Sequence, residues 1–179
     1  MHELSTPSPW VERFMSLLAR GDRVLDVACG SGRHARLIVG LGGEVEAVDR
    51  DAEALATMDG VAGIHTHRAD LEAGDWPYAS QEFDAIVVTN YLHRPLFAHL
   101  AASLNDSGVL IYETFMLGNE RFGKPSSPAF LLRSGELLEF AALGLEIVAF
   151  EQGYTAHPKP ALVQRLAAVK PGFLRSRSI

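Results

Sequence analysis

The sequence RVLDVACGSGR, residues 23–33, decides the fold of this chain. Its first part, 23–28, is apolar except for Arg23 and Asp26 and predicts a buried strand, and the glycines after it predict a tight turn. An amphipathic stretch from about Arg33 to Leu41 follows and predicts a helix. A strand, a glycine-rich turn and a helix in this order are typical of open parallel sheets, which bind ligands at the carboxyl ends of their strands.

The same alternation continues on both sides of this stretch. Further strands are expected at 44–48, 63–67, 83–89, 109–114, 146–154 and 161–170, and further helices at 10–19, 52–58, 97–104 and 134–143, the last one capped by Ser134. The last two strands are joined only by 156–160, which is too short for a crossover helix, so they should form an antiparallel hairpin. The predicted fold is α/β: a Rossmann-like, doubly wound, mostly parallel seven-stranded sheet with a C-terminal antiparallel hairpin strand.

Composition narrows the class of protein. The chain has 179 residues, of which 47% are apolar and 21% charged, and its net charge is −6, so we expect a folded domain that does not grip nucleic acid phosphates. Its single cysteine, Cys29, excludes an internal disulfide framework and any cysteine-based zinc site. The sequence shows neither an apolar run of about 18 residues nor a signal peptide, so no membrane association and a cytoplasmic location are expected.

We expect one domain over residues 1–179. Within it, 1–20 should form an N-terminal helix or lid, and 116–128 is long enough to be a functional loop over the active site. Trp10 and Phe14 either pack in the core or form the other side of such a lid. The tail 175–179 should be frayed.

The residues at the predicted strand ends point to a nucleoside ligand. Gly30, Gly32 and Ala35 fit the dinucleotide-binding fingerprint, and the helix start after them can receive a pyrophosphate or a carboxylate. Asp26 lies inside the strand, where its negative charge suits a ligand ammonium better than a pyrophosphate. Asp70, after the third strand, is placed to meet an adenine amino group.

Taken together, these residues carry a resemblance. Residues 24–33 resemble the first motif of class I S-adenosylmethionine-dependent methyltransferases, and the short Gly-Ser-Gly-Arg run is similar to the tellurite-resistance-type group of small-molecule enzymes. Asp49 matches the acidic residue that holds the ribose in that family, and Asp70 with Leu71 matches the adenine-contacting pair. The resemblance implies S-adenosylmethionine as cofactor, bound by residues at the strand ends: Asp26, Ala28, Cys29, Gly30, Gly32, Arg33, Asp49, Arg50, Asp70, Leu71, Thr89 and Asn90.

Two positions depart from the family pattern. Ala28 stands where the family often has glycine, so the backbone there must accommodate a methyl group. Arg50 follows the ribose-binding acid, where an apolar residue often packs on adenine. Its guanidinium could stack on the base or point to solvent.

The candidates for chemistry follow the fourth and fifth strands. Tyr91 and His93 could reach the path of the methyl group, and His93 could act as a general base or be an ordinary surface histidine. Glu113, at a strand end, could bind a substrate amine, take a proton or anchor the loop after it. No metal is expected, because the alternating His65 and His67 lack a third ligand.

The residues therefore predict a methyltransferase that transfers the methyl group of S-adenosylmethionine in line to a small-molecule acceptor, as a monomer or homodimer. Two alternatives remain. One is a non-catalytic module that binds adenosylmethionine and regulates a partner. The other is an NAD-dependent oxidoreductase that uses the same glycine turn.

Overall fold

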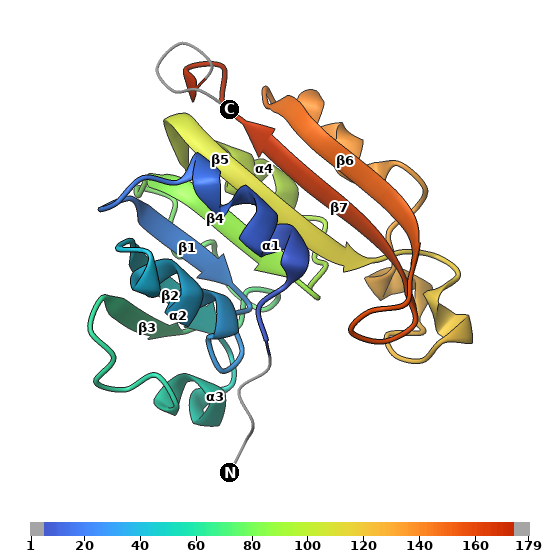
Figure 1. The fold of residues 1–179 in the computed structure, drawn as a ribbon, viewed down its shortest axis with the longest axis horizontal. Helices are drawn as coiled ribbons and strands as arrows, with labels where there is room; N and C mark the ends of the chain where they lie inside the picture. The colour runs from blue at the N-terminus through green and yellow to red at the C-terminus, as the bar shows by residue number, and fades with distance from the viewer. Residues whose placement is uncertain (1–5, 174–179) are drawn as a thin grey trace.

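A seven-stranded sheet runs through the molecule in the order β3-β2-β1-β4-β5-β7-β6 (Figure 1). The computed structural model describes residues 6–173. The strands are β1 (Arg23–Val27), β2 (Glu44–Asp49), β3 (Ile64–Arg68), β4 (Phe83–Thr89), β5 (Leu104–Phe115), β6 (Glu146–Thr155) and β7 (Ala161–Val169). β1 to β5 pair in parallel, and β7 inserts antiparallel between β5 and β6. This confirms the predicted fold, including the hairpin.

Helices cover both faces of the sheet (Figure 1). α1 (Pro9–Phe14), the 3₁₀-helix η1 (Met15–Leu17), α2 (Arg33–Gly40) and α3 (Ala52–Ala56) contribute to one apolar cluster. α4 (Leu96–Ala102) and the 3₁₀-helix η4 (Glu136–Ala141) contribute to the other. Two more 3₁₀-helices, η2 (Asn119–Arg121) and η3 (Pro128–Phe130), lie in the segment between β5 and η4.

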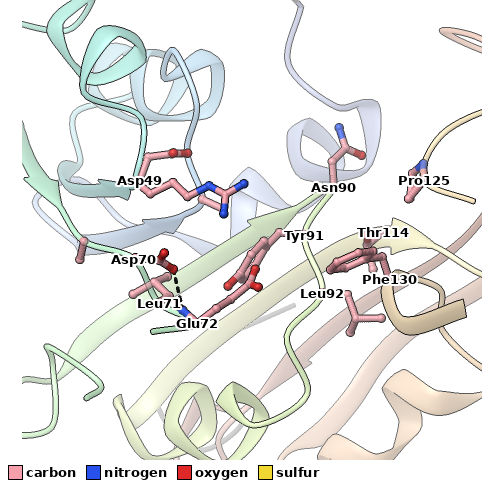
Figure 2. Close-up of a pocket in the computed structure, with 13 residues that line it drawn as sticks. Asp49, Asp70, Leu71, Glu72, Asn90, Tyr91, Leu92, Thr114, Pro125 and Phe130 are labelled. Atoms are coloured by element: carbon pink, nitrogen blue, oxygen red, sulfur yellow. Dashed lines mark hydrogen bonds between the residues drawn. The ribbon is translucent and has the colours of Figure 1, made fainter. Parts of the chain in front are cut away.

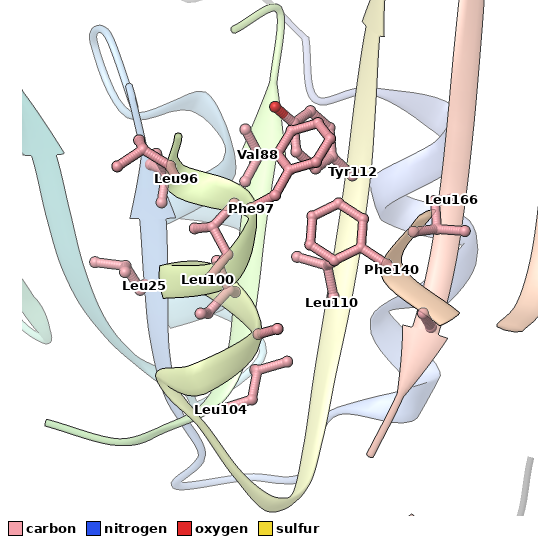
Figure 3. Close-up of a cluster of buried hydrophobic side chains, with 14 of the residues drawn as sticks. Leu25, Val88, Leu96, Phe97, Leu100, Leu104, Leu110, Tyr112, Phe140 and Leu166 are labelled. Atoms are coloured by element: carbon pink, nitrogen blue, oxygen red, sulfur yellow. The ribbon is translucent and has the colours of Figure 1, made fainter. Parts of the chain in front are cut away.

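The alternation of side chains along β4 explains why two cores form. Successive strand residues point to opposite faces of a sheet. Ala85 and Val87 join the cluster beneath α1, α2 and α3, whereas Ile86 and Val88 join the cluster beneath α4. Figure 3 shows the second cluster, in which Phe97 of α4 packs against Phe140 of η4 and both rings lie next to Tyr112 of β5. Burial on both faces also explains why this strand reads as a continuous apolar run.

Several expected boundaries are corrected by the structure. The first helix ends at Phe14 and continues only as η1, and β5 begins at Leu104 instead of 109. The helix expected at 134–143 is the shorter 3₁₀-helix η4, and it begins after Gly135, whose φ of 72° is left-handed. Ser134 does not cap it, because its hydroxyl accepts a hydrogen bond from Gln152 Nε2 instead (3.0 Å). Residues 1–5 of the expected N-terminal segment and the tail 175–179 lie outside the described residues.

The topology places the carboxyl ends of β1, β2, β3 and β4 along one edge of the sheet. The chain leaves β1 towards β2 and β3, then returns to the other side of β1 with β4. Ligands bind in open α/β sheets at such a reversal of strand order. Among residues 6–173, no helix is both long enough and apolar enough to cross a membrane.

Candidate active site

The turn after β1 has a left-handed backbone at three positions. Ala28, Gly30 and Gly32 have φ values of 52°, 54° and 78°. At Ala28 this conformation strains an L-residue, which accounts for the glycine often found there in the family. Cys29 is buried in the core below the turn, and its backbone N–H donates to Val48 O (3.1 Å). This hydrogen bond ties the turn to β2.

We expect substitution of Gly32 to be more damaging than substitution of Gly30. A Cβ at Gly32 would lie 2.0 Å from Met58 Sδ, whereas a Cβ at Gly30 meets nothing within 4 Å. Gly30→Ala should cost about 1–2 kcal/mol from its positive φ, and Gly32→Ala about 1–3 kcal/mol more because Met58 is forced to move. Chemical denaturation of both variants tests this, and equal losses would show that Met58 yields freely.

Asp26 lies beneath the same turn. Its side chain is buried and its Oδ2 accepts a hydrogen bond from Ala35 N of α2 (3.1 Å). Burial raises the pKa of this carboxyl to about 7, although the Ala35 bond and the charge of Arg33 pull the pKa down. The charged form of the Asp26 carboxyl therefore costs the folded protein free energy. A cation at the turn would reduce that cost.

Replacing Asp26 with asparagine should stabilise the protein without its ligand. Because the folded pKa lies above the usual 3.8, this carboxyl favours folding most below pH 3.8, and its contribution falls as the pH rises to about 7. Asp26→Asn should therefore raise the free energy of unfolding at pH 8 by about 1–2 kcal/mol, and this gain should shrink towards pH 4. Thermal unfolding at both pH values measures it. A variant less stable than the parent at pH 8 would contradict this assignment.

Asp49, at the end of β2, connects two loops at the edge of the sheet. Its Oδ2 accepts from Gly30 N (2.8 Å) and its Oδ1 from Asp51 N (2.9 Å). These bonds fix the carboxylate, and each oxygen keeps a lone pair for a further donor. Two adjacent hydroxyl groups of a ribose are donors of the right number.

A cavity of about 400 Å³ opens beside Asp49. It is lined by Ala28, Asp49, Arg50, Ala69, Asp70, Leu71, Glu72, Asn90, Tyr91, Leu92, Thr114, Pro125 and Phe130. Figure 2 shows Asp49 and Asp70 on one side, Thr114 and Phe130 on the other, and Tyr91 between them. Asp70 is oriented by a hydrogen bond that its Oδ1 accepts from Glu72 N (3.0 Å). The cavity therefore combines acceptors at one end with apolar walls at the other.

The Tyr91 hydroxyl is a polar group buried in the wall of this cavity. It makes no hydrogen bond of standard geometry among residues 6–173, and the Glu72 carboxylate is the side chain that interacts with it. Burial, followed by the charges of Glu72 and Asp70, raises the pKa of Tyr91, so the hydroxyl keeps its proton. Figure 2 shows its ring pointing towards Glu72 and Asp70. A buried hydroxyl without a well-formed hydrogen bond is costly, and an adenosine bound here would offer it a partner.

Arg94 fixes the apolar wall of this cavity. Its Nη1 and Nη2 donate to Ala129 O (3.0 Å) and Leu131 O (2.9 Å), on either side of Phe130. Its Nε and Nη2 also donate to the two carboxylate oxygens of Glu136 (2.5 and 2.9 Å). The turn after β4 is thereby tied to the segment that carries Phe130.

A second cavity of about 370 Å³ lies on the other side of Asn90. Its walls come from the N-terminal segment, the end of β5 and the hairpin: Thr6, Pro7, Ser8, Pro9, Glu12, Arg33, Asn90, Glu113, Phe115, Thr155, His157, Pro158, Lys159, Ala161, Val163 and Arg165. Asn90 borders both cavities and has a φ of 55°. Asn90, which follows β4, thus forms part of the wall of both cavities.

A chain of polar contacts holds the N-terminal segment against this second cavity. Ser8 N donates to His34 Nε2 (3.0 Å), and the other ring nitrogen faces Thr89 Oγ1 (3.4 Å). Ser8 Oγ donates to Glu113 Oε1 (2.8 Å), and Arg165 donates to the other oxygen of Glu113. Burial, with the charge of Arg33, lowers the pKa of His34 to about 3, so the ring is neutral and accepts the Ser8 bond at Nε2.

The predicted cofactor residues fall into three groups. Ala28, Asp49, Arg50, Asp70, Leu71 and Asn90 line the first cavity; Arg33 lines the second; and Asp26, Cys29, Gly30, Gly32 and Thr89 lie outside both linings, in β1, the turn after it and the end of β4. Arg33 donates to Thr6 O (3.2 Å). The contacts of these residues with a cofactor stay predictions.

The three predicted catalytic residues are not brought together. Tyr91 lines the first cavity, Glu113 lines the second, and His93 lines neither. Both carboxylate oxygens of Glu113 already accept hydrogen bonds, from Ser8 and Arg165. Their roles in catalysis stay predictions, but the geometry of Glu113 is that of an anchor.

Sequence reasoning missed the partners that shape the second cavity. His34 gave a weak signal, as a histidine directly after the glycine turn on an expected buried helix face. The hairpin residues gave none, because 156–160 reads as an ordinary proline-rich connection. The long loop contributes less than expected: within 116–128, only Pro125 lines either cavity.

The fold and the first cavity define a class: a Rossmann-like domain with a nucleoside-cofactor site at the carboxyl edge of its sheet. Residues 24–108 match the family model of a methyltransferase domain. A protein-L-isoaspartate O-methyltransferase of Anaeromyxobacter dehalogenans is 40% identical over 106 residues, which are 52% of this chain and 50% of that protein. The chain thus spans about half the length of this relative.

Solved structures agree over most of the chain. TehB from Haemophilus influenzae superposes with a TM-score of 0.75 at 19% identity, over 92% of this chain and 62% of that one. A TehB-like S-adenosylmethionine-dependent methyltransferase from Corynebacterium glutamicum gives 0.66 at 19% identity, over 90% and 86%. At these identities the structures establish a shared fold.

Residues 24–108 are thus similar to a methyltransferase domain, and most of the chain shares its fold with TehB-like structures. S-adenosylmethionine is the cofactor that this implies. The residues fit it: paired acceptors at Asp49, an acidic residue at Asp70 and a buried hydroxyl at Tyr91.

Proposed function

We propose that the protein transfers a methyl group from S-adenosylmethionine to a small-molecule acceptor. The observation that supports this is that two cavities lie side by side and share Asn90 in their walls. One cavity has the residues for adenosine, and the other, of about 370 Å³, is of a size that suits small ligands. A cofactor that lies in the first would present its reactive end at the wall that they share.

The residues of the first cavity would hold and orient the cofactor. Asp49 would accept from the ribose hydroxyls, Asp70 from the adenine amino group, and Leu71 would pack against the ring. S-adenosylmethionine supplies a methyl group already activated by its sulfonium, so the protein need not provide strong acid or base chemistry. Arg94 and Glu136 would position Phe130 to exclude water from one side.

Positioning is then the main contribution of the protein to the rate. Holding two reactants in line can contribute roughly 7–11 kcal/mol. Tyr91 is a poor base, because burial raises the pKa of its hydroxyl. Glu113 is engaged by Ser8 and Arg165, so its role here is to hold the N-terminal segment as a wall of the acceptor site.

The structure disfavours the two alternatives in different ways. An NAD-dependent oxidoreductase of the doubly wound type has a sixth strand beside β5, whereas here β7 inserts antiparallel between β5 and β6. A regulatory module needs no second cavity next to the cofactor site. Neither alternative predicts a labelled product from methyl-labelled S-adenosylmethionine. The regulatory module should still bind S-adenosylhomocysteine, whereas the oxidoreductase should bind NAD⁺ instead.

Label transfer tests the proposed activity. The purified protein is incubated with methyl-labelled S-adenosylmethionine and a deproteinised metabolite extract, and small-molecule products are separated by chromatography. We expect at least one labelled product that requires the protein. Binding of S-adenosylhomocysteine without any labelled product from any fraction would favour the regulatory module instead.

A further inference from the structure

The second cavity has a charge distribution that methyl transfer alone does not explain. Among its charged side chains, Glu113 and Arg165 form an ion pair and compensate each other. Lys159, at the hairpin tip, makes no hydrogen bond or ion pair among residues 6–173, and the Arg33 guanidinium donates only to the neutral Thr6 O. Glu12 is the single remaining carboxylate in the lining. Beside the ion pair, the lining therefore has two cationic side chains against one carboxylate, in a protein whose net charge is −6. The charge of Arg33 also acts on Asp26, which leaves exposed Lys159 as the cation without a carboxylate partner among residues 6–173.

The rest of the wall combines polar residues with an apolar part that contains three prolines. Pro7 and Pro9 come from the N-terminal segment, Phe115 from the end of β5, and Pro158 and Val163 from the hairpin. Prolines restrict the backbone, so these walls lose little conformational freedom when a ligand binds. Such surfaces stabilise an apolar ligand body by removing it from water.

From these two features we propose that the acceptor is an organic acid: a small molecule with an apolar body and a carboxylate that Lys159 recognises. This inference rests on the proposed function, because it assigns the acceptor class of the same site. Lys159 is a specificity-determining residue in this account, and it is separate from the residues that hold the cofactor.

A carboxylate fits this cavity better than a phosphate or an inorganic oxyanion. Phosphate sites gather several donors, often backbone N–H groups at a helix start or an arginine fork. Here the charged donors left free are one lysine ammonium and the part of the Arg33 guanidinium that Thr6 O does not engage. An inorganic oxyanion would also leave Phe115 and Val163 without a ligand group to cover them.

Two matched probes test the proposal. Phenylacetate and phenylacetamide have the same apolar body, and only the first has a negative charge. Their binding is measured by calorimetry to protein saturated with S-adenosylhomocysteine. Because hydrogen bonds to charged groups are stronger than neutral ones, we expect the acid to bind about 10-fold more tightly than the amide.

Lys159→Gln should reduce this preference to about twofold or less, since glutamine keeps a donor but loses the charge. Lys170→Gln is the matched control: this lysine follows the other end of β7 and lines neither cavity, so the 10-fold preference should remain. Amide binding as strong as the acid, an unchanged preference in Lys159→Gln, or binding of neither probe would overturn the proposal.

The experiment separates this inference from the proposed function. Saturation with S-adenosylhomocysteine is measured first. If it fails, the methyltransferase proposal fails, and the probes are then titrated into the protein alone. If it succeeds and the acid shows no preference, only the acceptor class is wrong.

Discussion

Asp49→Ala should weaken the binding of S-adenosylhomocysteine by about 100-fold or more. The ribose would lose two hydrogen bonds to a fixed carboxylate, each worth about 1.5 kcal/mol or more. The loss is increased because Asp49 also fixes the backbone of Gly30 and Asp51 (2.8 and 2.9 Å). Calorimetric titration of the variant gives the dissociation constant directly.

Asp51→Ala is the matched control for this variant. Asp51 lies two residues further along, caps α3 by accepting from Glu53 N and Ala54 N (2.9 and 3.2 Å), and lines neither cavity. Its loss should cost about 1 kcal/mol of stability and leave the affinity for S-adenosylhomocysteine within about threefold. If Asp49→Ala also stays within that range, the ribose contact is misplaced.

Arg94→Ala should be among the most destabilising single substitutions in the chain. The side chain of Glu136 is only 1% exposed, and without Arg94 its charge would rely on Arg133, which is 64% exposed. Removing one partner of a buried ion pair costs about 3–5 kcal/mol, and we expect a loss near the lower end of this range because the Arg94 side chain is 36% exposed. Chemical denaturation measures this loss. The affinity for S-adenosylhomocysteine should also fall, because the segment that carries Phe130 is released from the turn after β4.

Two further variants test whether the loss of stability comes from the uncompensated charge of Glu136 or from a general loss of packing. Arg133→Ala should cost less than about 1 kcal/mol, because exposed ion pairs contribute little. The double variant Arg94→Met with Glu136→Met removes both charges and should recover much of the stability lost in Arg94→Ala. If the double variant is as unstable as the single one, an uncompensated Glu136 is not the cause.

The pH dependence of the same ion pair has a definite sign. Burial alone raises the pKa of Glu136, but the hydrogen bonds from Arg94 and Arg133 outweigh it and lower this pKa to about 2, from the usual 4.5. A lowered carboxyl pKa stabilises the fold above about pH 4.5, and this contribution is lost as the pH falls towards 2. Arg94→Ala should therefore be less sensitive to acid in this range than the parent protein.

The sequence predicted those parts of the fold that depend on local patterns. β4 was predicted over 83–89, as observed, because a strand buried on both faces gives a continuous apolar run. The cap of η4 was predicted wrongly, since Ser134 and Gln152 come together only in the folded chain.

The first cavity was predicted far better than the second, because its residues follow from local patterns in the sequence. Asp49 and Asp70 each end or follow a strand, so their common edge follows from the parallel sheet. The contacts of Ser8 with His34 and Glu113 join residues 26 and 105 positions apart, and no local pattern reports them. The hairpin residues line the second cavity only because β7 pairs antiparallel with β5.

The central claim is that the cavity beside Asp49 binds the adenosyl group of S-adenosylmethionine. Calorimetric titration of the purified protein with S-adenosylhomocysteine, with NAD⁺ as the competing ligand, tests it most directly. The account predicts saturable binding of one S-adenosylhomocysteine per chain and no detectable binding of NAD⁺. Binding of NAD⁺ alone, or of neither ligand, would contradict it.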